Sequence, residues 1–534
     1  MVKITVYDTT LRDGAQTEGI SFSVEDKLKI AHKLDRLGFH YIEGGWPGSN
    51  PKDIEFFNRI RDAELESAVI TAFGSTRKKN IRPADDENLA AIIKSGVKAA
   101  TLFGKSWDFH VTRALNTTLA ENLSMIRESV AYLREQGLEV IYDAEHFFDG
   151  YKANPDYAIE TLEAAAAGGA AALVLCDTNG GTLPGELKAA VEKVCSRFSL
   201  PVGIHAHNDA GMAVANTLMA VEAGASHVQG TVNGYGERCG NADLCTVLPN
   251  LTLKCGINTI HPEKMRHLVE LSRYVSEIAN VHPNPQQPYV GMSAFASKAG
   301  VHVSAVMKDP QTYEHINPEL VGNRRRVLVS ELSGLSNVLY KLRELNLDLP
   351  TQGEAARQVL AELKELEHRG FQFESAEGSF ELLLLRAANG LEKPFLLESL
   401  RIYTELKEGG AVHSEATIKL RVADETVHTA AEGNGPVNAL DNALRKALER
   451  FYPNIEKMRL TDYKVRVLDE AAGTGALVRV LIETADGERT WTTVGVSANI
   501  IEASWQALAD SFAYGLLKSK GTGTETASGG SPPS

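Results

Sequence analysis

Cysteine is scarce in this sequence of 534 residues, and long apolar runs and an excess of basic residues are missing. The five cysteines form no CxxC pair, and a low, odd number in a long chain argues against a disulfide framework. No run of about 18 apolar residues occurs, so no membrane-spanning helix is expected. The N-terminus MVKITVYD begins directly on a strand pattern, which argues against a secretory signal. These features predict a cytoplasmic protein with reduced thiols and no membrane contact.

The charge balance argues against nucleic acid as a partner. The formal net charge is -14, whereas binding a phosphate backbone requires a basic surface. Hydrophobic residues make up 43% of the chain and charged residues 23%, as in ordinary globular proteins. A small anionic ligand stays possible, because a local arginine or a metal ion can outweigh the net charge. The length predicts two or three domains.

Eight short apolar segments, each followed by a helical pattern, occupy about the first 240 residues, the number and length typical of a (β/α)8 barrel. In the first helical pattern, Ser23 is a suitable N-cap and Gly38 a suitable terminator. An ordinary doubly wound sheet also alternates strand and helix, so the count alone leaves both folds open. The expected strands are Lys3–Thr9, Phe39–Trp46, Ser67–Gly74, Lys98–Gly104, Glu139–Glu145, Ala172–Asp177, Pro201–His207 and His227–Val232.

Polar side chains follow these strands at the ends where a barrel carries its chemistry. Apolar strands that end in charged residues would build a poor core, but they suit the mouth of an active site. We therefore expect an α/β TIM barrel with a catalytic site at its carboxyl end. The polar segments are Asp8 to Gln16, Glu43, Glu145, Asp177 to Asn179, His205 to Asp209 and Asn233 to Asn241.

Four of these residues predict a metal site. His205 and His207 are two apart on a strand, so both rings project from one face. Asp13 and Asn241 follow the first and last strands, which are neighbours when a barrel closes. Two nitrogen and two oxygen ligands suit Mg, Mn, Co or Zn, and leave positions where a 2-oxo acid could chelate. The alternative is that the histidines are hydrogen-bonded core residues.

Three long motifs resemble one enzyme family. They are DTTLRDGAQ, HAHNDAGMAVANTLMAVEAGASHVQGTVNGYGERCGNADL and SKAGVHVSAV. The chain, over about residues 1 to 518, is similar to the acetyl-CoA-dependent 2-oxo-acid synthases of the DRE-TIM metallolyase superfamily. That group contains 2-isopropylmalate, homocitrate and citramalate synthases, and HYIEGGWPGSNPKD resembles the citramalate branch. The resemblance implies an acyltransferase that condenses acetyl-CoA with pyruvate and water to give (R)-citramalate and CoA, on the citramalate route to isoleucine.

The resemblance also assigns roles to individual residues. Arg12, the arginine of the RDG motif, holds a developing negative oxygen, although a purely structural ion pair with Glu43 is the alternative. Glu145 and His302 match a catalytic dyad, and Tyr313 matches a tyrosine that supports proton transfer or activates the hydrolytic water. Because nothing local demands catalysis at His302 and Tyr313, the alternative is that both simply pack in a surface subdomain.

Three further residues are expected to contact the substrate or support those that do. Thr178 would hydrogen-bond the substrate carboxylate, or would merely cap a helix. Gln16 and Glu43 are further candidates for lining the substrate site.

One departure leaves the substrate open. Some citramalate synthases carry a tyrosine two residues before the catalytic glutamate, and here that position is Asp143. Because one methylene is worth only about 1–3 kcal/mol in discrimination, 2-oxobutyrate or 2-oxoisovalerate stays possible. The rival functions are 2-isopropylmalate or homocitrate synthesis, a retro-aldol acyl-CoA lyase, and an inactive amino-acid sensor.

The remaining chain predicts a connecting region and a regulatory domain. The proline-rich HPNPQQP at 282–288 is a hinge, and ATIKLRVADETVHTAAEGNGPVNALDNALRKAL is echoed by ALVRVLIETADGERTWTTVGVSANIIEASWQAL. The repeat resembles the dimer-forming regulatory domain of 2-isopropylmalate synthases, which implies a homodimer, with isoleucine as a feedback inhibitor whose carboxylate could sit on the GNGPV turn. The expected division is 1–282 catalytic barrel, 283–395 mostly helical connecting subdomain, 396–518 C-terminal α+β regulatory domain and 519–534 disordered tail.

Overall fold

The computed structural model describes residues 4–329, 335–344, 352–389, 391–406, 412–468, 473 and 475–520. The chain forms two compact units that divide at Phe295 and Ala296, with His315–Arg325 returning to the first unit. The predicted disordered tail begins at residue 519, and its residues beyond position 520 lie outside the described part of the chain. The four-part division made from the sequence stays a prediction.

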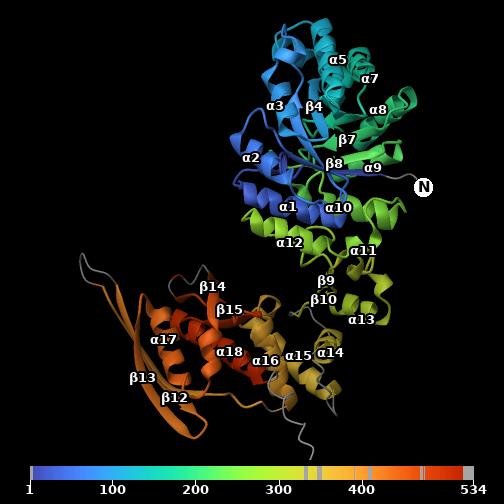
Figure 1. Ribbon diagram of the computed structural model, residues 1–534. Coiled ribbons are helices and arrows are strands. Elements are labelled where there is room, and N and C mark those ends of the chain that lie inside the picture. Colours follow the sequence, from blue (N-terminus) through green and yellow to red (C-terminus); the bar gives the residue numbers. More distant parts are fainter. Residues whose placement is uncertain are drawn as a thin grey trace, which may run out of the picture. The chain divides into compact units, whose positions relative to one another are not determined.

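Eight parallel strands close into a barrel in sequence order, with β1 paired to both β2 and β8 (Figure 1). This confirms the (β/α)8 fold and excludes the doubly wound sheet. The strands are β1 (Thr5–Asp8), β2 (Tyr41–Gly45), β3 (Val69–Ser75), β4 (Ala99–Lys105), β5 (Glu139–Glu145), β6 (Ala172–Asp177), β7 (Val202–Ala206) and β8 (His227–Gly230).

The helices that surround the barrel begin and end where local chemistry dictates. In α1 (Val24–Leu37), Ser23 and Asp26 form a reciprocal capping box, and Gly38 ends the helix with a φ of 90°. The other helices of this unit are α2 (Pro51–Ile60), α3 (Glu87–Ser95), α4 (Asp108–Arg113), α5 (Leu119–Glu135), α6 (Phe147–Ala153), α7 (Pro155–Gly168), α8 (Pro184–Arg197), α9 (Ala213–Glu222), α10 (Leu244–Pro249), α11 (Pro262–Met265) and α12 (Leu268–Ile278).

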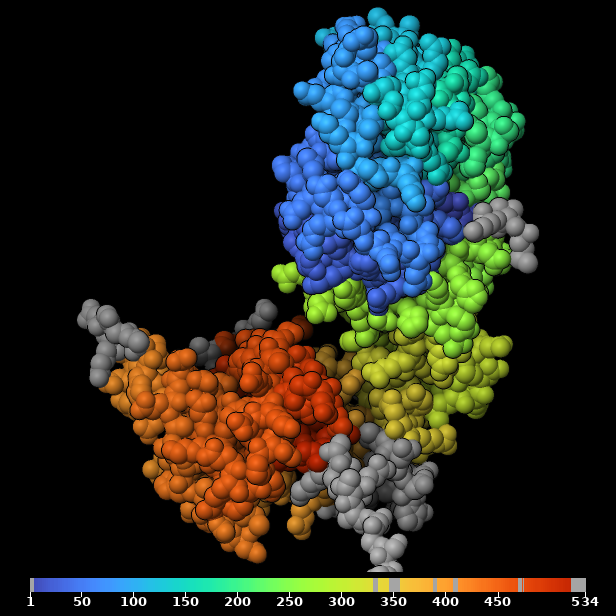
Figure 2. Space-filling view, viewed as in Figure 1, coloured from blue at the N-terminus to red at the C-terminus, as the bar shows by residue number. Residues whose placement is uncertain are grey.

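The first unit has two cores. The larger lies between the strands and the helices, and a smaller one inside the barrel contains Tyr7, Ile141 and Val174. The Tyr7 hydroxyl lies within hydrogen-bond distance of Glu43, Thr71 and Thr101, so a fully buried polar network forms the floor beneath the barrel mouth. In space-filling form the residues of this unit make one continuous body, coloured blue through green (Figure 2).

The second unit begins with helices and ends with two similar layers of sheet and helix. A short bridge joins β9 (Ala296–Ser297) to β10 (Arg326–Val327), and the helices are α13 (Gly300–Lys308), α14 (Leu335–Glu344), α15 (Gln352–His368) and α16 (Glu377–Asn389). Among the helices of the described residues, none is both long enough and apolar enough to cross a membrane.

The internal repeat of the sequence corresponds to two copies of three antiparallel strands followed by a helix. Figure 1 labels the two helices, α17 and α18. Arg386 and Ser379 of α16 contact Asp510 of the last helix, so α16 packs with the second copy. The copies are β11 (Leu396–Glu405), β12 (His413–Val422), β13 (Glu425–Gly433) and α17 (Pro436–Leu448), then β14 (Arg459–Val467), β15 (Val478–Ala485), β16 (Thr490–Ser497) and α18 (Ile500–Lys520).

Candidate active site

A pocket of about 200 Å³ opens at the carboxyl ends of the barrel strands. All of its lining residues belong to the first unit. Seven of them are residues that the sequence had marked for chemistry, so the fold brings most of the candidates together. The lining consists of Arg12, Asp13, Gln16, Trp46, Phe73, Phe103, Asp143, Glu145, Cys176, Thr178, His205, His207, Glu237 and Arg238.

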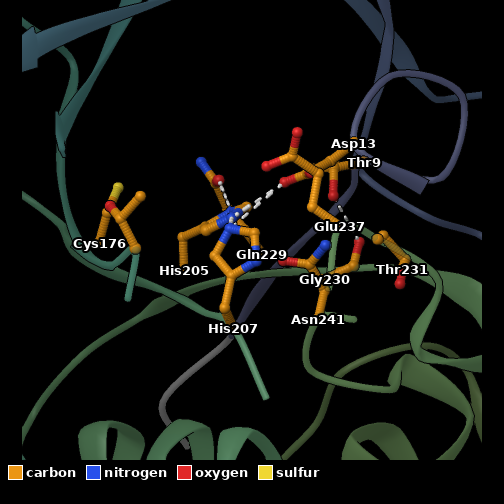
Figure 3. Close-up of polar contacts among 12 residues, drawn as sticks. Thr9, Asp13, Cys176, His205, His207, Gln229, Gly230, Thr231, Glu237 and Asn241 are labelled. Carbon is orange, nitrogen blue, oxygen red and sulfur yellow. Dashed lines mark hydrogen bonds and ion pairs between the residues drawn. The ribbon is translucent and has the colours of Figure 1, made fainter. Parts of the chain in front are cut away.

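Asp13, His205 and His207 form a buried group with the geometry of a metal site. The two histidine Nε2 atoms are 3.4 Å apart. They lie 3.2 Å (His205) and 3.8 Å (His207) from Oδ2 of Asp13. Figure 3 shows these three side chains converging from β7 and from the loop after β1. One cation could therefore contact all three without rearrangement of the strands.

Asn241 supplies a fourth ligand atom of the right kind. Its backbone forms an isolated bridge with His207, which brings the loop after β8 against the end of β7 (Figure 3). Its Nδ2 donates to the carbonyl of Tyr235 at 3.1 Å. Its Oδ1 is buried and has no hydrogen-bond partner among the described residues. Because an unpaired buried oxygen is unfavourable, these donors fit a hard or borderline divalent cation.

A relay of hydrogen bonds fixes the His205 ring. Nδ1 of His205 contacts Oε1 of Gln229 at 2.9 Å, and Nε2 of Gln229 donates to Oδ1 of Asp143 at 3.0 Å. Because the Gln229 amide donates to a carboxylate at one end, it presents an acceptor to the imidazole at the other. Nδ1 of His205 therefore carries a proton, and in the neutral ring the lone pair of Nε2 faces Asp13 and His207.

Replacing Gln229 with methionine should weaken divalent-metal affinity by about 10- to 100-fold, because the ring loses the acceptor that sets its tautomer. Metal affinity measured by fluorescence competition checks this expectation. The matched control is Gln136→Met, at an exposed position after α5. Wild-type affinity in Gln229→Met would show that the relay does not orient the ligand.

Electrostatics keep Asp13 and His207 in the forms that metal binding needs. Burial raises the pKa of Asp13, but the nearby Arg12 charge and the bond to His205 outweigh it, so the net pKa is lowered. Burial and the charge of His205 lower the pKa of His207 to about 4, so this ring is neutral at neutral pH. For His205, burial is outweighed by the bond to Asp13 and its charge, and the pKa is raised.

Arg12 lines the pocket, and its side chain is held by Glu43 and Phe73. Its Nε donates to Oε1 of Glu43 at 2.6 Å, and its guanidinium carbon lies 3.7 Å from the centre of the Phe73 ring. Glu43 is fully buried and also accepts from the Tyr7 hydroxyl at 2.8 Å. Burial by itself would lower the pKa of Arg12. The charges of Glu43 and Asp13 outweigh burial, so the net pKa is raised and the side chain stays cationic. Glu43 therefore holds Arg12 and is not among the residues that line the cavity.

Three aromatic side chains close one wall of the pocket. The Phe73 and Phe103 rings stack with centroids 5.1 Å apart, and the edge of Trp46 meets them at 5.7 and 5.5 Å. The Trp46 indole nitrogen donates to Asn88 Oδ1 at 2.6 Å, which fixes the ring. This wall presents a packed apolar surface beside Arg12.

The other candidates in the barrel sit at the rim. Glu145 ends β5, and its carboxylate pairs with the Lys105 ammonium from the end of β4. Gln16 and Thr178 come from the loops after β1 and β6 and line the same cavity. The Thr178 hydroxyl accepts a hydrogen bond from the backbone N–H of His146 at 2.9 Å. The cavity thus combines a cation site, a fixed positive charge, a carboxylate and a hydroxyl.

His302 and Tyr313 lie in the second unit, His302 on α13 and Tyr313 shortly after it. Their ring centroids are 4.3 Å apart, so the two residues form a pair. The Tyr313 side chain is exposed. The structure brings these two together, whereas the barrel pocket is built without them. Their catalytic roles stay a prediction.

Sequence reasoning passed over several residues that shape the pocket. Gln229 is the third residue of β8, and Phe73 and Phe103 point inward from β3 and β4. An alternating reading of each strand would have marked them as facing the barrel interior. Asp143 was noticed as a departure from a pattern, but nothing local indicated that it pairs with Gln229.

Models of known families cover almost the whole chain. Residues 3–275 match the HMGL-like family, residues 289–370 the homocitrate synthase post-HMGL domain-like family, and residues 374–516 the LeuA allosteric (dimerisation) domain. A closed parallel barrel with a buried Asp-His-His group at its carboxyl end, followed by these two domains, defines an HMGL-like barrel enzyme with an allosteric-type C-terminal domain.

The chain belongs to the (R)-citramalate synthase family within that class. The (R)-citramalate synthase of Synechocystis sp. is 56% identical over 523 residues, with 96% of each chain covered. That of Geobacter sulfurreducens is 56% identical over 521 residues, covering 97% of this chain and 99% of the relative. A probable 2-isopropylmalate synthase of Methanosarcina mazei is 32% identical over 97% of this chain and 96% of its own length. The 2-isopropylmalate synthases are therefore the more distant branch.

Proposed function

We propose that this enzyme condenses acetyl-CoA with pyruvate and water to give (R)-citramalate and CoA in the cytoplasm. The observation that carries the proposal is the buried Asp13, His205 and His207 group beside Arg12, in a chain that aligns end to end with (R)-citramalate synthases. Five (R)-citramalate synthases that are 50–56% identical to this chain also support the proposal. We place the product on a route to isoleucine.

Asp13, His205, His207 and the Asn241 amide oxygen would hold Mg, Mn, Co or Zn. Such a cation would supply Lewis acidity to the ketone of a bound 2-oxo acid and make its carbon electrophilic. The chain's own contribution is the Arg12 guanidinium, which Glu43 fixes in place before the reaction. A positive charge already oriented toward the forming alkoxide stabilises the transition state without reorganisation.

The second requirement is removal of a proton from the acetyl methyl group. We assign this work to Glu145 together with His302 and Tyr313. The methyl carbon loses a proton to the base and bonds to the keto carbon of pyruvate, whose oxygen becomes the alkoxide and then the hydroxyl of the product. Water then attacks the thioester carbonyl, and CoA leaves as the thiol. Thr178 and Gln16 bind the pyruvate carboxylate.

The aromatic wall supports pyruvate as the substrate. Trp46, Phe73 and Phe103 pack against one another beside Arg12, so they would leave room for a methyl group rather than a branched chain. Asp143 is turned toward Gln229, whose amide donates to it. The size limit at this pocket would therefore come from β2, β3 and β4.

The substrate panel tests the proposal directly. The metal-loaded protein is assayed for CoA release with acetyl-CoA and each 2-oxo acid, and the product is identified by chromatography. We expect kcat/KM for pyruvate to exceed that for 2-oxobutyrate by about tenfold and that for 2-oxoisovalerate by more, because each added carbon meets the wall. Faster turnover of 2-oxoisovalerate would contradict the pyruvate assignment and favour 2-isopropylmalate synthesis.

The C-terminal domain is assigned to dimer formation and feedback inhibition by isoleucine. Residues 374–516 match an allosteric dimerisation domain, and Gly435 precedes the first turn of α17 with an extended backbone. Of the side chains that the structure describes, none caps the start of α17, so N–H groups of its first turn suit an amino-acid carboxylate.

Isoleucine is expected to lower the initial rate at millimolar concentration, with leucine and valine as matched controls, while light scattering reports a dimer. A flat response to isoleucine up to millimolar levels would remove the regulatory assignment and leave a structural one.

A further inference from the structure

Thr178 is held at two points by residues from other loops. Its Oγ1 accepts from the His146 backbone N–H at 2.9 Å, and its carbonyl accepts from Nη2 of Arg238 at 2.7 Å. Because the hydroxyl oxygen is the acceptor in the first bond, its own proton is left for a partner on the pocket side, where Thr178 forms part of the lining. The side chain is therefore set to donate into the pocket.

Both residues that hold Thr178 have an unfavourable backbone conformation. His146 and Arg238 each have a φ of 56°, in the left-handed region. In the described part of the chain eight non-glycine residues have positive φ, and four of these are asparagines, which tolerate the conformation. Two of the remaining four donate to the same threonine. Strained residues that converge on one pocket residue point to function rather than to chance.

Each strained residue is fixed by its side chain. Nδ1 of His146 lies 3.2 Å from Oδ2 of Asp149, which also accepts from Nδ2 of Asn179 at 3.0 Å. The His146 ring packs against His110, with centroids 4.2 Å apart. These contacts tie the loop after β5 to the loop after β6.

Arg238 is fixed in the same way from the other side. It forms a two-point ion pair with Asp209, with Nε at 2.8 Å from Oδ1 and Nη2 at 3.0 Å from Oδ2. Asp209 follows β7 and Arg238 follows β8, so the loop after β8 reaches Thr178 while the loop after β7 holds Arg238. The threonine is thus clamped between the loops after β5 and β8.

We propose that His146 and Arg238 are positioning residues that orient Thr178, so that its hydroxyl donates to the carboxylate of the bound 2-oxo acid. This inference rests on the proposed function, since it names what one residue of that site binds. His146 acts through its backbone N–H in the left-handed conformation, and its imidazole serves to hold that conformation. Arg238 acts through the Thr178 carbonyl.

A matched pair of variants separates the effect of the His146 backbone conformation from the effect of its imidazole ring. His146→Val removes the ring and, being β-branched, disfavours positive φ; His146→Asn removes the ring but tolerates it. Asn280→Val, at a residue with a φ of 54° after α12, imposes the same backbone strain outside the pocket lining. Each metal-loaded protein is measured for pyruvate KM, acetyl-CoA KM and kcat, and for pyruvate Kd by calorimetry without acetyl-CoA.

We expect His146→Val to raise pyruvate KM and Kd by about tenfold or more, because a hydrogen bond to a charged group is lost. The rise in His146→Asn should be at most about threefold, and metal affinity and acetyl-CoA KM should stay near wild type in both. Asn280→Val should lower only thermal stability. Equal pyruvate affinity in His146→Val and wild type would overturn the proposal. An equal loss of kcat in both His146 variants with unchanged pyruvate Kd would also overturn it, since the imidazole would then be catalytic.

Arg238→Met gives a second reading if His146→Val does not fold. It should raise pyruvate KM with little change in acetyl-CoA KM, and an unchanged pyruvate KM would overturn the role of Arg238. A wild-type protein without turnover on acetyl-CoA and pyruvate would instead contradict the proposed function. The two failures are distinguishable, because the inference is read from the ratio of variant to wild-type pyruvate affinity.

Discussion

Replacing His207 with alanine is expected to abolish turnover and to weaken divalent-metal binding by at least about 100-fold, since loss of an outer partner alone costs about 10- to 100-fold. The Nε2 atom of His207 lies 3.4 Å from Nε2 of His205 and 3.8 Å from Oδ2 of Asp13, so its removal takes one nitrogen donor from the group. Metal affinity by calorimetry and CoA release with acetyl-CoA and pyruvate are the measurements. Circular dichroism should show an intact fold, because the ring contributes little to the apolar core.

The matched control is His267→Ala, at a histidine just before α12 whose side chain is 61% exposed. It loses only a surface contact with Glu270 and should keep wild-type affinity and turnover. Retention of metal affinity in His207→Ala would remove this residue from the ligand set, and the proposed activation of the ketone would then lose its basis.

Replacing Arg12 with glutamine should have two separable effects. Turnover should fall by about 100- to 1000-fold, because the charge that faces the forming alkoxide is lost. The free energy of unfolding should fall by about 3–5 kcal/mol, because the fully buried Glu43 carboxylate loses its partner. Steady-state kinetics and chemical denaturation measure the two effects independently.

The double variant Arg12→Gln with Glu43→Gln separates catalysis from stability. Neutralising both partners leaves no unpaired buried charge, so most of the lost stability should return. Turnover should stay low, because the guanidinium is still absent. If activity returned together with stability, Arg12 would be a purely structural ion-pair partner, as one interpretation of the sequence allowed.

The barrel and the Asp13, His205 and His207 group were predictable because both follow from local periodicity. Strand spacing predicted eight parallel strands, and two histidines two residues apart had to share a face. Closure then had to bring Asp13, after the first strand, beside Asn241, after the last. Glu43 was harder to interpret, because a glutamate at a strand end gives no sign of whether it faces the ligand or lies beneath an arginine. Its bond to Tyr7 joins neighbouring strands, and only the closed barrel reveals it.

Residues that act through another residue left no local signal. In the sequence Gln229 is one polar residue in a short strand. Its contact with His205 is oriented by its hydrogen bond to Asp143, which lies 86 positions away. His146 and Arg238 stand out only through their positive φ angles, which no residue pattern in the sequence predicts. His302 and Tyr313 were marked only through resemblance. In the C-terminal repeat, β11 and β14 were missed because the similarity between the copies begins at the next strand.

The closure of the barrel gives the metal group a consequence beyond the reaction. β1 and β8 meet along only four residue pairs, from Thr5 with His227 to Asp8 with Gly230. Asp13 stands on one side of this seam, and His205, His207 and Asn241 stand on the other. An ion held by all four would lock the first strand of the barrel to the last, so the metal site could not be complete during synthesis before the loop after the eighth strand had emerged.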